Sequence, residues 1–180
     1  MRGPATPQPM SDCAGNTLLW NGEVFGGGVP VPAGENDTDA VFTALRQRGD
    51  SASVPSVLGS IEGPWACIFW EASSRSLWFG RDSMGRRSLL LGRAPDGGQG
   101  WVLASVVPPC CQGWEWCELP PSGIFQLQLA AEGFSVRTEH GNSMGLLMHH
   151  AWPCSPARAT VRPADSEPSA GAPPPTVLAG

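Results

Sequence analysis

Residues 62–90 read EGPWACIFWEASSRSLWFGRDSMGRRSLL and contain the clearest strand signals of the chain. The run Trp65–Ala72 is apolar at nearly every position, which is typical of a strand that is covered on both faces. Ser73-Ser74-Arg75 provides the turn of a hairpin, and Leu77–Asp82 provides the second strand. This stretch therefore predicts a β-hairpin at the centre of a sheet.

More strands are predicted on both sides of this hairpin. Alternating or apolar runs bounded by Gly, Pro or Ser mark each of them. They are Thr17–Trp20, which ends at an Asn-Gly turn, then Ser88–Gly92, Trp101–Ser105, Gly123–Leu129 and Phe134–Thr138. We expect the last two to pair as a hairpin around residues 130–133.

One clear helix is predicted between the first strand and the central hairpin. Asn36 or Asp37 is a suitable N-cap, acidic Asp39 lies in the first turn, and Gly49 ends the helix. A second, short helix is predicted around residues 55–61. The ordered part is therefore expected to be α+β and dominated by strands.

The composition excludes several classes of protein. The chain has 180 residues, a formal net charge of −5 and 11 cationic side chains, all of them Arg, so no basic face for nucleic acid is expected. We also expect no membrane partner, because no apolar window reaches the roughly 18 residues that a membrane helix needs. The N-terminus lacks the apolar segment of a secretory signal, which favours a cytoplasmic location with reduced thiols.

Metal binding is not expected from the spacing of the thiols and imidazoles. Cys110, Cys111 and Cys117 precede His149, His150 and Cys154 without the paired spacing of common zinc modules.

Residues 140–180 are rich in Pro and Ala and lack apolar periodicity, so we expect a largely disordered tail there. The folded domain is accordingly predicted to span residues 1–139.

The segment Trp20–Phe25, WNGEVF, contains the first candidate site. The Asn21 carboxamide and the neighbouring Gly22 N–H are two donors that could converge on an oxyanion, and Gly permits close approach. An ordinary Asn-Gly turn at the end of a strand explains the same dipeptide.

Two further positions have both a structural and a functional interpretation. Asp37 is either a plain N-cap or a carboxylate that binds a substrate ammonium group. Arg81 and Asp82, followed by Gly85, are expected to form a charge-assisted pair that fixes a turn, while an anion site built with Arg86 and Arg87 is the alternative.

Taken in order, these motifs resemble the type-2 glutamine amidotransferase domain of the asparagine synthetase family. The resemblance rests on WNGEVF, then NDTDAVFTAL, then EGPWACIFWEASSRSLWFGRDSMGRRSLL, and it extends from residue 2 to about residue 138. In that family the pattern is roughly NGEIYN, [ST]-D-x-E, GxFAF and GRDxxGxxPL, and Ser88 stands here where Pro is usual. The resemblance implies a four-layer α-β-β-α sandwich of the N-terminal nucleophile type, of which this chain would form a part.

The resemblance also assigns roles to particular residues. Asn21 and Gly22 match the oxyanion donors, Asp37 matches the residue that holds the glutamine ammonium group, and Glu23 occupies the acidic position beside the donors. Arg2 matches the arginine that binds the glutamine carboxylate.

The resemblance implies a nucleophile that this sequence does not provide at the matching place. In the family, the N-terminal Cys attacks the glutamine amide and its own α-amino group acts as the base. This sequence begins one residue before Arg2, and Cys13 has no α-amine beside it. We therefore expect a chain that contains the glutamine-binding part but lacks glutaminase activity, as an incomplete gene model or a shortened isoform.

Glutamine and a synthetase domain of the same parent protein are the expected partners. ATP and Mg²⁺ are expected only in that synthetase domain, and no cofactor is expected in this chain. A non-catalytic interaction module of the same fold is the alternative, and an unrelated α+β domain is a third.

Overall fold

The computed structural model of the chain describes residues 6–49, 53–95, 100–129 and 146–152. In chain order its elements are β1 (Met10–Ser11), β2 (Thr17–Gly22), β3 (Gly26–Gly27), α1 (Asp37–Gln47), α2 (Val54–Gly59), β4 (Ile61–Glu62), β5 (Trp65–Glu71), β6 (Ser76–Arg81), β7 (Leu90–Arg93), β8 (Trp101–Ala104), a 3₁₀ turn (Pro109–Cys111), β9 (Glu115–Glu118), β10 (Gly123–Gln128) and β11 (Leu146–Ala151).

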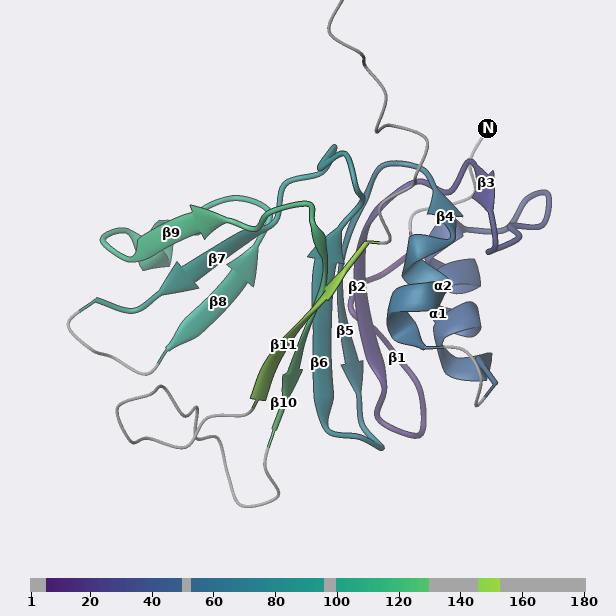
Figure 1. Cartoon of the computed structure of the whole chain (residues 1–180), viewed down its shortest axis with the longest axis horizontal. Helices are drawn as coiled ribbons and strands as arrows, with labels where there is room; N and C mark the ends of the chain where they lie inside the picture. The colour runs from purple at the N-terminus through teal and green to yellow at the C-terminus, as the bar shows by residue number, and fades with distance from the viewer. Residues whose placement is uncertain (1–5, 50–52, 96–99, 130–145, 153–180) are drawn as a thin grey trace, which may run out of the picture.

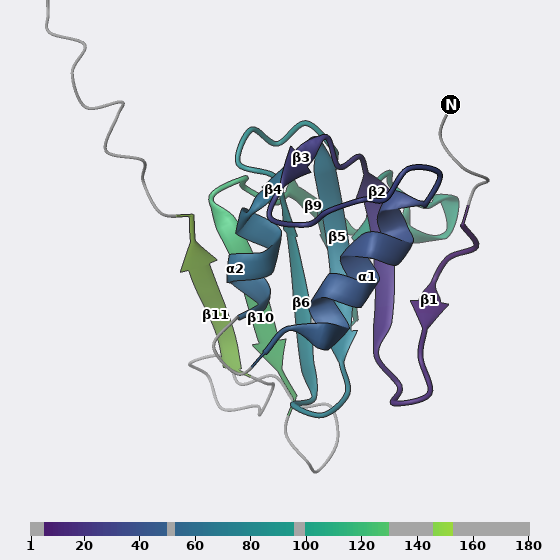
Figure 2. The same ribbon diagram turned by 90° about the vertical axis from the view of Figure 1, so that its right-hand side faces the viewer.

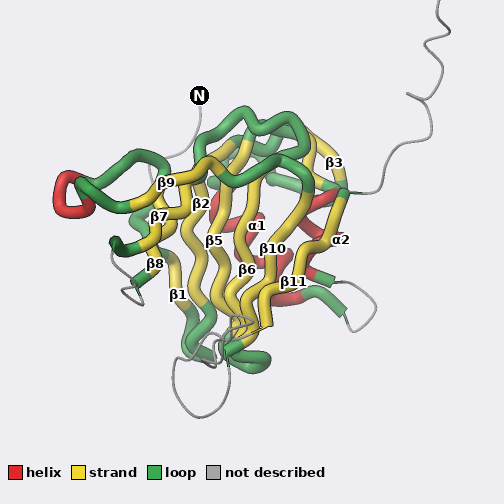
Figure 3. The backbone as a smooth tube through the Cα atoms, turned by 60° about the vertical axis from the view of Figure 1, so that its left-hand side comes forward, coloured by secondary structure: helices red, strands yellow, loops and turns green. Residues whose placement is uncertain are grey.

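The predicted hairpin forms the middle of a six-stranded antiparallel sheet (Figure 3). The strand order is β1-β2-β5-β6-β10-β11, and β5 pairs with β6 from Ala66↔Arg81 to Glu71↔Ser76. Side chains of β5 alternate between the two faces of the sheet, and both faces are covered. Trp65, Cys67 and Phe69 belong to one buried cluster, while Ala66 belongs to the other. This explains why β5 is apolar from Trp65 to Trp70.

Helices α1 and α2 cover one face of the large sheet (Figure 2). Val41, Phe42 and Leu45 of α1 are almost completely buried, and the Phe42 ring packs edge-on against Phe69 of β5 with 6.5 Å between ring centroids. The 3.6-residue period of α1 places these three side chains on one stripe facing the sheet.

A second sheet of three strands, in the order β8-β7-β9, covers part of the opposite face (Figure 1). Its cluster includes Phe79, Leu89 and Leu119, all buried. The described residues thus form three layers, helices, large sheet and small sheet, of the four that the resemblance implies. Strands β7 and β8 match the predicted runs to within two residues at their starts, whereas β9 was not predicted.

The predicted pairing of Gly123–Leu129 with residues 134–138 is wrong. Strand β10 pairs with β6 on one edge and with β11 on the other, from Gly123↔Ala151 to Gln128↔Leu146. A strand has only two edges, so no third strand can pair with β10 in the plane of the sheet. β11 also lies inside the range predicted as a disordered tail, so the sheet extends the domain beyond residue 139. Residues 130–145 and 153–180 lie outside the described part of the chain.

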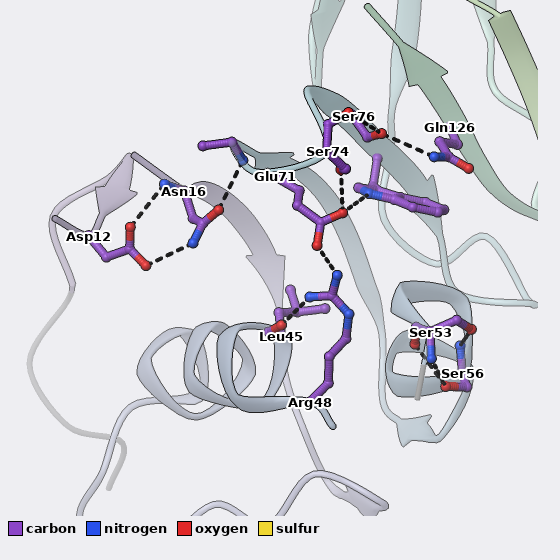
Figure 4. Close-up of polar contacts among 12 residues, drawn as sticks. Asp12, Asn16, Leu45, Arg48, Ser53, Ser56, Glu71, Ser74, Ser76 and Gln126 are labelled. Atoms are coloured by element: carbon purple, nitrogen blue, oxygen red, sulfur yellow. Dashed lines mark hydrogen bonds and ion pairs between the residues drawn. The ribbon is translucent and has the colours of Figure 1, made fainter. Parts of the chain in front are cut away.

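A polar cluster fastens the end of α1 to the sheet at the end opposite the Asn-Gly segment (Figure 4). The Arg48 guanidinium donates to the Leu45 carbonyl and forms an ion pair with Glu71, whose other carboxylate oxygen accepts from Ser74 Oγ at 2.6 Å. The Trp78 indole N–H donates to that same oxygen at 3.3 Å. Because the Arg48 and Glu71 side chains are only 18% and 13% exposed, removing either one would leave the other charge largely buried without its partner.

Candidate functional site

The structure brings Asn21, Gly22, Glu23 and Asp37 to one cleft. The cleft has a volume of about 270 Å³ and lies between the end of β2 and the start of α1. Its lining residues are Thr6, Gln8, Trp20, Asn21, Gly22, Glu23, Glu35, Asn36, Asp37 and Thr38. The chain between β2 and α1 turns back, so residues about 15 positions apart in the sequence line the same cleft.

Asp37 is not the N-cap of α1. Asn36 takes that role, because its Oδ1 accepts a hydrogen bond from Thr38 N at 2.8 Å. Asp37 is the first helical residue, and its Oδ2 accepts from Val24 N at 2.8 Å. This bond connects the start of the helix to the chain just after β2, and it holds the carboxylate in the cleft. The position also lies at the positive end of the helix dipole, where a carboxylate is favoured.

The interpretation of Asn21-Gly22 as an ordinary turn is wrong. Both residues belong to β2 and pair with β5, as Asn21↔Ala66 and Gly22↔Trp65. A Cβ atom on Gly22 would lie 2.5 Å from Trp65 Cβ and 2.7 Å from Pro64 O. Gly22 is therefore required by the close approach of the two strands, and Asn21 and Gly22 border the cleft as the last two residues of β2.

Gln8 is a cleft residue that sequence reasoning missed. Its carboxamide forms two hydrogen bonds with the backbone of Trp20: Nε2 donates to the Trp20 carbonyl at 2.6 Å, and Oε1 accepts from Trp20 N at 2.7 Å. The Gln8 side chain thus satisfies the backbone N–H and carbonyl of Trp20 on the edge of β2, beyond the end of β1. No local pattern around Gln8 signals this contact, because its partner lies twelve residues away.

The loop after β6 does not form the predicted pair between Arg81 and Asp82. Arg81 is 5% exposed and donates to the carbonyls of Arg87, Leu119 and Gly85, at 2.6, 2.9 and 2.5 Å. It also forms an ion pair with Glu118 at 2.9 Å.

Asp82 organises the same loop through different contacts. Its two oxygens accept from the backbone N–H groups of Trp65, Met84 and Arg86 at 3.0–3.1 Å. The Arg86 Nε donates to Asp82 Oδ1 at 3.2 Å. Gly85 adopts a φ of +64°, which favours glycine. These contacts are those of a structural turn.

The three arginines of this segment do not gather into an anion site. Arg81 points into the loop, Arg86 pairs with Asp82, and Arg87 Nη2 lies 3.7 Å from Glu23 Oε1. The contact of Arg87 places a cation beside an acidic residue of the cleft. Arg86 and Arg87 thus each have a carboxylate partner within the domain.

No cysteine of the described residues lines the cleft around Asp37. Cys67 is buried on β5, and burial raises the pKa of its thiol to about 12, so at neutral pH it is protonated and a poor nucleophile. It lines a second, larger cavity of about 650 Å³ between the two sheets, which Asn21 also borders. Cys13 is exposed, before β2. Arg2 lies outside the described residues.

No helix of the described residues is long and apolar enough to cross a membrane. No three His, Cys, Asp or Glu side chains of the described part lie close enough together to hold a metal ion.

Comparison with protein families identifies the domain. Residues 30–110 match the family model described as "Glutamine amidotransferase domain". The chain carries a glutamine amidotransferase domain. The matched range contains Asp37, the central hairpin and the loop after β6, whereas Asn21 and Gly22 precede it.

Curated relatives agree with this assignment. Proteins called asparagine synthetase domain-containing protein 1 from Bos taurus and Homo sapiens are 42% identical to this chain over 75% and 72% of its length. The protein of that name from Gallus gallus is 44% identical over 72% of this chain. The aligned parts are 21%, 20% and 20% of those proteins, so the chain spans about a fifth of their length.

Solved structures confirm the fold of the amidotransferase domain. The glutamine phosphoribosylpyrophosphate amidotransferase from B. subtilis, complexed with ADP and GMP, superposes with a TM-score of 0.51 at 16% identity and covers 82% of this chain and 31% of its own. A structure described as the allosteric regulatory enzyme of purine biosynthesis gives the same score and identity over 78% of this chain and 29% of its own. The α+β sandwich expected from the resemblance is thereby confirmed as the fold.

Proposed function

We propose that the cleft between β2 and α1 binds L-glutamine. The observation that carries this proposal is the placement of Asp37: its carboxylate is released from capping, tied to Val24 N at 2.8 Å, and faces the cleft that Asn21 and Gly22 also line. Glu23 and Glu35 line the same cleft, so its charge suits an ammonium group.

In the proposed arrangement, Asp37 accepts hydrogen bonds from the ammonium group of glutamine. The side chain of the ligand extends toward the end of β2, where the Asn21 carboxamide and the Gly22 N–H donate to its amide oxygen. The same two donors would stabilise the negative charge of a tetrahedral intermediate during hydrolysis. Arg2 is the proposed partner of the ligand's carboxylate.

The 180-residue chain is proposed to bind glutamine without hydrolysing it. Hydrolysis in this way needs a thiolate that attacks the amide carbon, forms a thioester and releases ammonia. Among the described cysteines, Cys67 is held protonated by burial, and Cys13 is not one of the residues that line the cleft. Oxyanion donors alone leave only a small part of the catalysis of such a site.

The wider function proposed for the parent protein is asparagine formation from glutamine, aspartate and ATP. The names of the curated relatives support this proposal, because they describe proteins that contain an asparagine synthetase domain. ATP and Mg²⁺ would bind that synthetase domain, ammonia would pass to it from the amidotransferase domain, and the protein would work in the cytoplasm.

Calorimetric titration of the chain with L-glutamine tests the binding proposal. We expect Asp37→Asn to weaken binding at least tenfold, because it removes a charge-assisted hydrogen bond. Asp39→Asn is the matched control: it removes the same charge from the same helical turn, but Asp39 is exposed and outside the cleft lining.

Equal losses of glutamine affinity in Asp37→Asn and Asp39→Asn would show that the effect comes from the net charge alone and would refute the proposed site. Absence of any glutamine binding to the unmodified chain would favour the non-catalytic interaction module. A separate assay follows ammonia release from glutamine, for which we expect no signal above the buffer. Release that Asn21→Ala abolishes would refute the proposed inactivity.

A further inference from the structure

Gln8 borders both the cleft around Asp37 and the larger cavity between the two sheets, but the proposed binding of glutamine gives it no task. Its carboxamide holds both backbone polar groups of Trp20, with hydrogen bonds of 2.6 Å to the carbonyl and 2.7 Å from the N–H. Trp20 is only 4% exposed, and it directly precedes Asn21 and Gly22, the two proposed donors to the ligand's amide oxygen.

The Gln8 carboxamide takes the place of a paired strand residue. Strand β1 pairs with β2 as Met10↔Leu18, and the same antiparallel register, continued by two residues, would bring Gln8 opposite Trp20. Strand β1 begins only at Met10, so the backbone of Gln8 is outside it. A primary amide has the donor and the acceptor that a peptide group would offer, and the side chain supplies both at this position.

The alternation of the sheet sets the direction of the Gly22 N–H. Along an antiparallel strand, the backbone polar groups of successive residues face opposite edges. Those of Trp20 face the edge where Gln8 lies, whereas Glu23 N donates to Pro64 O on the side of β5. The backbone groups of Gly22 therefore face the same edge as those of Trp20, away from β5.

This edge of β2 has a short backbone partner. Within the described part of the chain, β1 pairs with Thr17 and Leu18 only, so the ladder stops before Trp20. The Gln8 side chain extends the support by one position, up to the residue before Asn21. Donors to an oxyanion must lie within about 2.7–3.1 Å of the oxygen, so a small rotation of the backbone at Trp20 would misplace both of them.

We propose that Gln8 is a positioning residue for the part of the cleft that recognises the side-chain amide of glutamine. It acts through the backbone of Trp20 and keeps the Gly22 N–H and the Asn21 carboxamide aligned with the amide oxygen. It does not act on the ammonium group, which is assigned to Asp37. This inference rests on the proposed binding of glutamine and adds the residue that sets its selectivity for the amide.

L-Norvaline separates positioning from a general loss of structure, because it has a methyl group in place of the glutamine carboxamide. Calorimetric titration gives the Kd of both amino acids for the unmodified chain and for Gln8→Met, which keeps a side chain of similar length without the two hydrogen bonds. We expect Gln8→Met to weaken binding of L-glutamine about tenfold and of L-norvaline less than about twofold. Gln47→Met is the matched control, because Gln47 is exposed at the end of α1 and outside the cleft lining, and it should change neither Kd.

Amide hydrogen exchange of Trp20 measures the contact without a ligand. Loss of the acceptor on Gln8 should speed this exchange at least about tenfold in Gln8→Met and leave it unchanged in Gln47→Met. Urea unfolding checks that each variant is folded. Unchanged exchange of Trp20 in Gln8→Met would overturn the inference.

The titrations distinguish failure of this inference from failure of the proposed function. Equal weakening of both amino acids by Gln8→Met, or an unchanged Kd for L-glutamine in the folded variant, would overturn the role of Gln8 and leave glutamine binding by the unmodified chain in place. An unmodified chain that binds no L-glutamine would refute the proposed function, and the positioning role would fail with it.

Discussion

Replacement of Gly22 by Ala tests the close approach of β2 and β5 that forms one wall of the cleft. The added Cβ would lie 2.5 Å from Trp65 Cβ, 2.7 Å from Pro64 O and 2.8 Å from Trp65 Cα. Trp65 has little room to move, because it is 1% exposed and its ring stacks on Trp20 with 5.7 Å between centroids.

The size of the effect follows from these distances. Ordinary contacts begin near 3.4 Å, so the strands would have to separate by about 0.9 Å at this point. Overpacking of a rigid interior costs about 1–3 kcal/mol, and the upper half of that range applies here because backbone atoms are among the neighbours. A loss of about 2–3 kcal/mol lowers the Tm of a chain of this size by roughly 4–12 °C.

Urea unfolding followed by tryptophan fluorescence measures this loss. With a typical slope of about 2 kcal/mol/M, the midpoint of Gly22→Ala should fall by about 1 M. Gly49→Ala is the matched control, because no atom lies within 4 Å of its Cβ position. Equal midpoints for Gly22→Ala and Gly49→Ala would refute the argument that contact with β5 requires glycine.

Three other perturbations have expected outcomes. Glu71→Ala should lower the free energy of unfolding by about 3 kcal/mol, because it leaves the largely buried Arg48 guanidinium without its carboxylate. Exposed Glu115→Ala should change it by less than about 0.5 kcal/mol in the same urea assay, and comparable losses would contradict the reasoning. The hydrogen bond from Asn16 lowers the pKa of Asp12 below 3.8, so Asp12 stabilises the fold above that pH. The destabilisation by Asp12→Asn should therefore be present at pH 7 and shrink as the pH falls below 3.8, and a pH-independent difference would exclude this linkage. A chain ending at Trp152 should stay monomeric in sedimentation, whereas one ending at Gln128 should aggregate through the open edge of β10. Monomeric behaviour of the shorter chain would show that β11 is not needed to cover that edge.

Local patterns in the sequence were sufficient to predict the central elements of the fold. The β5–β6 hairpin was recognisable because apolar strands and their turn residues adjoin in the chain. Helix α1 was recognisable because an N-cap, acidic residues in the first turn and a buried stripe all lie within about a dozen residues. Local chemistry singled out Asn21, Gly22 and Asp37 as candidates, and the resemblance of the ordered motifs to the amidotransferase family added Glu23 and Arg2.

The tertiary structure decided which of two suitable residues performs which task. Asn36 and Asp37 are both good N-caps, and capping propensity does not separate them. The position of Val24, just after β2, separates them, because its N–H donates to the Asp37 carboxylate and Asn36 is left to cap the helix. In the same way, the position of β5 beside β2 made Asn21-Gly22 part of a strand instead of a turn.

Long-range pairing also decided the edge of the large sheet. Residues 134–138 were predicted to pair with β10 as a hairpin around residues 130–133. The entropy cost of closing a loop grows only slowly with its length, so the burial and hydrogen bonds gained by a more distant strand, here β11, decide the pairing. Strand β11 brings His150 to Gln126 at 3.1 Å and Trp152 edge-on against Trp65. These contacts join residues that are 24 and 87 positions apart, so their free energy belongs to the assembled sheet and leaves no signature in the local sequence.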